Sequence, residues 1–197
     1  EQNEVDLLFQ SQEPWLSKKW QAKSMISGIV LEDTKRHEVK NPSDTADIVG
    51  SLLYANHSQL DRCLISAQNA FNLNSHDPVR ILESLNRAAE LYEQNQFELM
   101  ALAMREAGKT YQDAIDEVRE AVDFLRYYSN LARRVLPNKR KAMGVFVCIS
   151  PWNFPLAIFT GQVAAALAAG NVVIAKPAES TSIIAYRASE LLIEAAI

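Results

Sequence analysis

The stretch that decides the fold runs from Gly144 to Thr181 and reads GVFVCISPWNFPLAIFTGQVAAALAAGNVVIAKPAEST. VFVCIS is a nearly continuous apolar run of strand length, which is typical of a strand buried on both faces. A proline-rich turn, a helical segment that ends at Gly170 and a second apolar run, NVVIAKP, follow it, and the helical pattern of residues 179–197 comes last. This strand–helix–strand–helix order with short joints predicts right-handed crossovers and a parallel sheet.

The residues before this stretch are predicted to be mainly helical. Apolar β-branched runs at 29–31 and 48–53 indicate two strands, joined by a loop that contains NPSDTAD. Further along, apolar residues at helical spacing predict four helices: 58–71, a helix opened by Pro78, a helix from about 97 to a left-handed cap at Gly108, and 111–134. In the first of these helices the stripe expected to be buried consists of Leu60, Leu64, Ala67 and Phe71.

The composition is that of a globular protein and excludes several functional classes. Of 197 residues, 48% are hydrophobic and 22% are charged, and a net charge of −4 gives no reason to expect binding to nucleic acid or to an anionic membrane. Two cysteines and three separated histidines supply neither a disulfide framework nor a metal site. The first residues, EQNEVDLL, lack the order of a signal peptide, and we expect a reducing compartment, the cytoplasm.

Polar residues follow both strands of the predicted parallel sheet. Ser150-Pro151-Trp152-Asn153 comes after the first strand, and Lys176-Pro177-Ala178-Glu179 comes after the second. Ligands of such sheets bind at the carboxyl ends of the strands, where Lys176 and Glu179 are suited to ribose hydroxyls. The alternative is that these two residues form a surface ion pair. A glycine-rich, pyrophosphate-binding turn is missing after the first strand, which argues against an ordinary dinucleotide-binding domain.

Asn153 has two interpretations. It precedes a helix, so its side chain is suited to cap that helix by accepting a hydrogen bond from a free backbone N–H. Alternatively, it is an amide donor at the mouth of the sheet, able to stabilise an oxyanion. The spacing of the sequence does not decide between the two.

These motifs resemble those of a known family. PWNFP followed by KPAE is similar to the start of the cofactor-binding domain in the aldehyde dehydrogenase superfamily. NPSDTADIVG suits the early strand pair of that family, and REAGKTYQDAIDEVREAVDFLRYY resembles the glutamate-γ-semialdehyde (1-pyrroline-5-carboxylate) dehydrogenase part of bifunctional proline utilization A proteins. The resemblance covers roughly residues 20–197 and is strongest over 105–185, whereas FNLNSHD stands where relatives commonly have a tryptophan.

The resemblance implies an α/β fold of the aldehyde dehydrogenase type. A helical N-terminal half leads into the first strand–helix–strand–helix units of a parallel, Rossmann-like sheet, which is incomplete in this chain. We expect a lead-in segment at 1–28, a strand pair and loop at 29–57, the helical part of the cofactor-binding domain at 58–143, and the first half of the NAD-binding sheet at 144–197.

The resemblance also implies a cofactor site for NAD. Lys176 and Glu179 would bind the adenine-ribose hydroxyls, and a carboxylate there repels a 2′-phosphate, which favours NAD over NADP. Ile149, Ser150 and Trp152 would line the channel on the nicotinamide side, mainly through their backbone. FAD is expected only if a proline dehydrogenase domain lies upstream, outside this chain.

On the substrate side, the resemblance implies three residues. Asn153 would donate its side-chain amide to the oxygen of the thiohemiacetal, and Phe154 would help to wall the substrate tunnel. Glu120 would lie on the helix that lines the same tunnel, where its carboxylate suits a substrate with an α-ammonium group. Helical periodicity places Glu120 on the polar face, so a solvated glutamate is the alternative.

Several family features lie outside the sequence. The nucleophilic cysteine, the general-base glutamate and the dimerising hairpin of the family have no counterpart here; Cys148 lies mid-strand and is expected to be a buried core residue, while Cys63 lies on an amphipathic helix with no base nearby in sequence. The chain begins at Glu1 and stops at Ile197 within a helical pattern, so we expect a piece of a larger polypeptide, inactive by itself.

The leading hypothesis is part of an NAD-dependent glutamate-γ-semialdehyde dehydrogenase that forms glutamate in proline catabolism. Its expected partners are a small aldehyde and further copies of the full-length enzyme, with no nucleic acid or membrane bound by this segment. The alternatives are an NAD-dependent dehydrogenase of another aldehyde and a non-catalytic helical interaction module that retains the scaffold.

Overall fold

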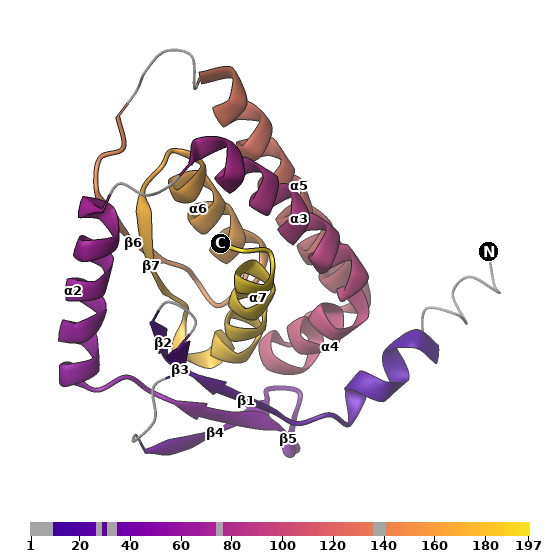
Figure 1. The fold of residues 1–197 in the computed structure, drawn as a ribbon. Coiled ribbons are helices and arrows are strands. Elements are labelled where there is room, and N and C mark those ends of the chain that lie inside the picture. Colours follow the sequence, from indigo (N-terminus) through magenta and orange to yellow (C-terminus); the bar gives the residue numbers. More distant parts are fainter. Residues whose placement is uncertain (1–9, 27–28, 31–34, 74–76, 136–140) are drawn as a thin grey trace.

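The computed structural model describes residues 10–26, 29–30, 35–73, 77–135 and 141–197 (Figure 1). A short helical segment at residues 10–16 precedes the first strand. The N-terminal strands are β1 (Trp20–Lys23), β2 (Met25–Ile26), β3 (Ile29–Val30), β4 (Arg36–Asn41) and β5 (Asp44–Leu53). They are followed by α2 (His57–Asn72), α3 (Pro78–Gln94), α4 (Gln96–Ala107), α5 (Tyr111–Val135), β6 (Val145–Ile149), α6 (Ala157–Ala168), β7 (Val172–Lys176), the 3₁₀ turn η2 (Glu179–Thr181) and α7 (Ser182–Glu194).

The strand–helix–strand unit predicted from residues 144–176 is confirmed. β6 and β7 are parallel and adjacent, with register pairs from Val145 opposite Val172 to Ile149 opposite Lys176. Helix α6 makes the crossover between them and packs against both strands (Figure 1). Because the strands are in register and parallel, their carboxyl ends lie at the same edge of the small sheet.

The strand pair predicted within residues 29–57 is wrong in its pairing. The strand at Ile29–Val30 pairs with β2, whereas β5 pairs antiparallel with β4 and parallel with β1 in a separate sheet of order β1-β5-β4. The NPSDTAD segment is thus the tight turn and first part of a β4–β5 hairpin rather than a long loop. β4 escaped prediction because its sequence, RHEVKN, is polar and mostly exposed, as an edge strand often is.

The predicted helices of the N-terminal half are present, and three of them form one packed layer. We call α3, α4 and α5 the helical layer; it packs against α6 and α7. Asp77 caps α3 by accepting a hydrogen bond from the Val79 amide, and Gly108 ends α4 with a φ of +67°. The left-handed cap predicted at Gly108 is confirmed, and this conformation disfavours any side chain with a Cβ.

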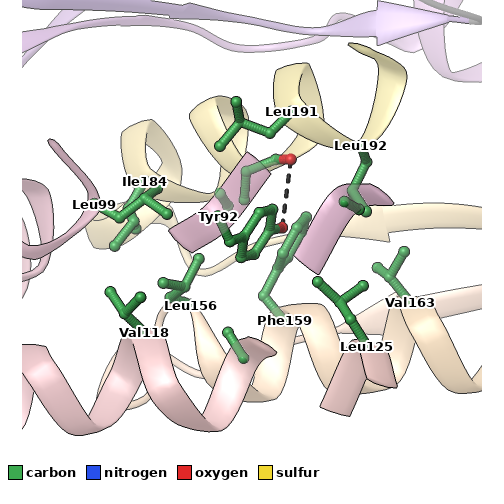
Figure 2. Close-up of a cluster of buried hydrophobic side chains, with 14 of the residues drawn as sticks. Tyr92, Leu99, Val118, Leu125, Leu156, Phe159, Val163, Ile184, Leu191 and Leu192 are labelled. Atoms are coloured by element: carbon green, nitrogen blue, oxygen red, sulfur yellow. Dashed lines mark hydrogen bonds between the residues drawn. The ribbon is translucent and has the colours of Figure 1, made fainter. Parts of the chain in front are cut away.

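The core lies between the helical layer and the helices of the α/β unit. Tyr92 of α3 is fully buried among Leu99, Leu156, Phe159 and Leu191, and its hydroxyl donates to the Ala188 carbonyl oxygen at 3.4 Å (Figure 2). Gly161 of α6 allows a close approach to α5, since a Cβ there would lie 2.9 Å from the Phe124 ring. These contacts fix α6, and therefore the loop that precedes it, against the helical layer.

The apolar surfaces of α2 and β6 are less covered than the sequence predicts. In α2, Ala67 is buried, but Leu60 and Leu64 of the predicted stripe remain about half exposed. In β6, only Cys148 is buried, so the prediction of a strand covered on both faces is wrong for the described residues. A largely apolar cavity of about 960 Å³ lies between α2, β7 and α7, and its lining includes Leu60, Leu64 and Val147.

Candidate functional site

The two loops that carry the predicted site residues lie next to each other. Ile149 pairs with Lys176 at the ends of β6 and β7, and the Ser150 amide donates to the Lys176 carbonyl oxygen at 3.2 Å. The loop after β6 therefore begins beside the loop after β7. This edge of the sheet brings Asn153 and Phe154 to the same end of the unit as Lys176 and Glu179.

Asn153 is exposed in the loop after β6, and it does not cap α6. The helix begins at Ala157, and Leu156 occupies the capping position, so the interpretation of Asn153 as the helix cap is wrong. No hydrogen bond of the Asn153 side chain occurs within the described ranges. Its amide is therefore available to a ligand.

A buried glutamate, and not Asn153, caps the N-terminus of α6. The Oε2 atom of Glu117, on α5, accepts hydrogen bonds from the amides of Leu156 at 3.1 Å and Ala157 at 3.0 Å. These amides belong to the first turn of α6, where backbone donors lack partners within the helix. A pyrophosphate cannot use these donors, because the Glu117 carboxylate occupies and screens them with negative charge.

Lys109 links Glu117 to the site loop. Its ammonium lies 3.3 Å from Oε1 of Glu117 and 4.4 Å from the centre of the Phe154 ring. Phe154 directly follows Asn153, so the joint between α4 and α5 contacts the loop beside the candidate oxyanion donor. Phe154 itself is partly exposed.

The loop after β7 presents Lys176 and Glu179 to solvent. The Lys176 ammonium donates to the Pro177 carbonyl oxygen at 3.1 Å, and among the described residues it makes no ion pair with Glu179. The surface ion pair considered as an alternative is therefore absent from this part of the chain. Burial, and secondarily the charge of Glu179, raise the pKa of Tyr54, which places the Glu179 carboxylate near that phenol.

The helix after this loop is capped in the same way as α6. The two carboxylate oxygens of Glu106, at the end of α4, accept hydrogen bonds from the amides of Ile183 at 2.7 Å and Ile184 at 2.8 Å. Burial raises the pKa of Glu106 to about 8, against the two amides, which lower it. The N-terminus of α7 is thus held by the helical layer.

The residues predicted to line the nicotinamide side lie at the end of β6 and in the loop after it. Ile149 and Trp152 are exposed, and the Ile149 carbonyl oxygen accepts a hydrogen bond from Gln162 at 3.2 Å. Ser150 is buried, and its hydroxyl has no hydrogen-bond partner within the described residues. An unsatisfied hydroxyl at the end of the strand is suited to a polar ligand group placed there.

Glu120, the remaining residue predicted for the substrate side, lies on α5. It is exposed on α5 and stands one helical turn after Glu117, so both side chains project from one side of the helix. The exposure of Glu120 agrees with the polar-face position predicted from periodicity.

Neither cysteine has the properties of a nucleophile. Cys148 is buried in β6, as predicted, and burial raises the pKa of its thiol; burial likewise raises the pKa of Cys63 on α2. Thiols with raised pKa values are protonated near neutral pH and react slowly. In the described residues no three His, Cys, Asp or Glu side chains are grouped as for a metal ion, and no helix there is long and apolar enough to cross a membrane.

Sequence reasoning missed Glu106 and Glu117. A signal for Glu117 was present, because it lies three residues after Ala114 and four before Ala121, and both alanines are fully buried. A charged residue on the apolar side of a helix indicates a buried polar contact. Its partners, backbone amides at the start of α6, have no signature in the sequence.

The motifs and the geometry agree with one family. The chain matches the aldehyde dehydrogenase family over residues 29–197, and it belongs to that family. The fold and the resemblance inferred from PWNFP and KPAE are thereby confirmed.

Within this family, the chain is similar to PutA proteins and to 1-pyrroline-5-carboxylate dehydrogenases. Bifunctional protein PutA of Klebsiella aerogenes is 48% identical over 181 residues, which are 91% of this chain and 14% of that protein. The solved structure of proline utilization A from Bdellovibrio bacteriovorus gives a TM-score of 0.93 at 27% identity and covers 100% of this chain and 22% of that one. 1-Pyrroline-5-carboxylate dehydrogenase from Thermus, solved with bound NAD, gives a TM-score of 0.87 at 30% identity, with 98% and 40% covered.

Proposed function

We propose that this chain is part of an NAD-dependent dehydrogenase that oxidises L-glutamate γ-semialdehyde, the open form of 1-pyrroline-5-carboxylate, to glutamate in proline catabolism. The observation that carries the proposal is the meeting of two loops at one sheet edge, one with a free amide at Asn153 and one with Lys176 and Glu179. The similarity to PutA supports the choice of substrate. Because the chain spans 14% of that relative, the activity belongs to the longer protein.

NAD fits the residues at the ends of β6 and β7. Lys176 donates and Glu179 accepts hydrogen bonds, which matches the two hydroxyls of an adenine ribose, and the Glu179 charge opposes a 2′-phosphate. Ile149, Ser150 and Trp152 line the approach to the nicotinamide, with the unpaired Ser150 hydroxyl as a further contact. NAD, when bound, supplies the acceptor for hydride from the aldehyde carbon.

On the substrate side, this chain orients and stabilises rather than attacks. The Asn153 amide donates to the aldehyde oxygen as negative charge develops on it. Phe154 forms an apolar wall beside it, and Glu120 accepts a hydrogen bond from the α-ammonium group of the substrate. The nucleophilic cysteine is supplied by the rest of the enzyme, which we expect to be a homo-oligomer in the cytoplasm; FAD would serve only a proline dehydrogenase domain elsewhere in it.

The test is an assay of the full-length protein that contains this chain. We expect NAD reduction with glutamate semialdehyde, much slower reduction with an aldehyde of similar length that lacks the amino group, and little activity with NADP. Equal rates with both aldehydes would assign the enzyme to another substrate. No NAD reduction with either aldehyde would favour a non-catalytic module.

A further inference from the structure

The helices that follow the two site loops share an unusual kind of N-terminus. Neither α6 nor α7 has a side-chain cap of its own. Instead, Glu117 of α5 accepts from the first amides of α6, and Glu106 of α4 accepts from those of α7. Both glutamates are almost fully buried, with relative exposures of 2% and 3%.

Each of these contacts couples the helical layer to one site loop. The first amides of a helix need an acceptor, which Glu117 and Glu106 supply, and a charged carboxylate at Glu117 also interacts favourably with the positive end of the α6 dipole. Removing the acceptor therefore leaves buried donors unsatisfied at the point where the loop enters the helix. The loop then loses the contact that fixes its end.

The contact at α6 extends to the residue beside Asn153. Lys109 lies 3.3 Å from Glu117 and 4.4 Å from the centre of the Phe154 ring, and Glu117 holds the amides of Leu156 and Ala157. Phe154, directly after Asn153, contacts the Lys109 ammonium, and Leu156, three residues after Asn153, donates to the Glu117 carboxylate that pairs with Lys109. At α7, the Glu106 contact follows Glu179 by four residues.

Building on the proposed function, we propose that Glu117, with Lys109, is a positioning residue for the Asn153 amide, and that Glu106 is the positioning residue for Lys176 and Glu179. The helical layer would then position the loop after β6 and the loop after β7 independently of each other. Glu117 controls the oxyanion donor, which acts in the chemical step. Glu106 controls the loop that binds the adenine ribose, which acts in cofactor affinity.

The experiment uses the full-length dehydrogenase with Glu117→Ala, Glu106→Ala and, as the matched control, Asp116→Asn. Asp116 is exposed and adjacent to Glu117, so its variant should behave as the parent enzyme. We expect Glu117→Ala to lower kcat by about ten- to a hundredfold, since small misplacement of a reacting group has effects of this size, while KM for NAD changes less than about twofold. Glu106→Ala should raise KM for NAD by roughly tenfold and lower kcat less than about threefold, because it weakens binding of the ribose.

The conservative variants sharpen the test. In Glu117 one oxygen accepts both amides, so Glu117→Gln retains the acceptor and should recover most of the kcat lost in Glu117→Ala. In Glu106 each oxygen accepts one amide, so Glu106→Gln should recover KM for NAD only partly. If Glu117→Ala does not fold, Lys109→Met keeps the Glu117 acceptor and should still lower kcat at unchanged KM for NAD.

Hydrogen exchange separates this proposal from the proposed function. Glu117→Ala should speed hydrogen exchange of the amides of residues 156 and 157 by about tenfold or more. Glu106→Ala should do the same for the amides of residues 183 and 184. Neither measurement depends on which substrate the enzyme uses. If the parent enzyme is inactive, the proposed function is rejected. The exchange rates then still test whether Glu117 and Glu106 hold the starts of α6 and α7. Variants that change kcat and KM for NAD together, or that raise exchange at both helices alike, would overturn the separate positioning roles.

Discussion

The helical layer and the β6–β7 sheet are both rich in apolar residues, but they differ in how well these residues are covered. In the helical layer Leu85, Leu99 and Leu125 are fully buried, whereas in β6 Val147 is 56% and Ile149 63% exposed. The helical layer is therefore well covered within the described residues, by its own helices and by α6 and α7. The apolar surface that remains open lies next to the candidate site.

The polar residues of the two regions differ in the opposite sense. In the helical layer Glu98 is buried and accepts hydrogen bonds from Lys18 at 2.6 Å, Trp20 at 2.8 Å and Arg187 at 2.8 Å. At the end of the sheet, the side chains of Asn153 and Glu179 are exposed and make no hydrogen bonds within the described residues. Saturated polar groups hold a fold together, whereas unsatisfied ones at a sheet edge are available for ligands.

The largest expected effect is a loss of stability in the helical layer. Leu85→Ala removes a fully buried side chain and should cost about 2–5 kcal/mol, because it loses apolar burial and leaves a cavity. The measurement is the urea midpoint of the full-length protein. Leu64→Ala on α2, where the side chain is half exposed, is the matched control and should cost about 1 kcal/mol or less.

Equal losses of unfolding free energy in Leu85→Ala and Leu64→Ala would contradict the difference in coverage between the helical layer and α2. They would mean that the apolar side of α2 is covered in the full-length protein as completely as the helical layer.

Next in size is the effect of Asn153→Ala on the reaction. It removes a donor aimed at developing negative charge and should lower kcat/KM by about 10²–10³ with any aldehyde. Since the side chain is exposed and unpaired, the urea midpoint should remain that of the parent enzyme. A large fall in stability with little change in rate would instead make Asn153 a structural residue.

Periodicity and motifs predicted the helices, the parallel β6–β7 unit and the position of the two loops at its carboxyl edge, whereas the roles of the residues in these loops stay predictions. Prediction from the sequence failed for contacts between residues that are distant along the chain. The pairing of β1 with β5 and the edge strand β4 have weak apolar patterns, and the use of Glu106 and Glu117 as helix caps depends on tertiary packing. The apolar run of β6 predicted burial on both faces, because hydrophobicity indicates that a surface needs covering and not which residues cover it.

A smaller effect is expected for Glu120→Ala, and it depends on the substrate. A charge-assisted hydrogen bond to the α-ammonium group is worth about 1.5–3 kcal/mol, so kcat/KM for the semialdehyde should fall about ten- to a hundredfold. An aldehyde without the amino group never uses this carboxylate and should lose much less. Equal losses with both aldehydes would return Glu120 to the solvated role that its exposure also permits.

The smallest effect concerns the pH dependence of the Glu98 cluster. Burial by itself raises the pKa of Glu98, but hydrogen bonds from Lys18, Trp20 and Arg187 outweigh it and lower the pKa below the ordinary value of 4.5. The ionised carboxylate therefore contributes its full stabilisation above pH 4.5, and this contribution is lost as the pH falls through the lower pKa of the folded state.

Urea midpoints of the parent and of Glu98→Gln should differ most near neutral pH and converge under acid. An exposed ion pair provides the control, because Glu93→Gln at the Arg126 contact should change the free energy of unfolding by less than about 1 kcal/mol at any pH. A gap between parent and Glu98→Gln that stays constant from pH 7 to about pH 3 would show that the cluster contributes through packing and not through charge.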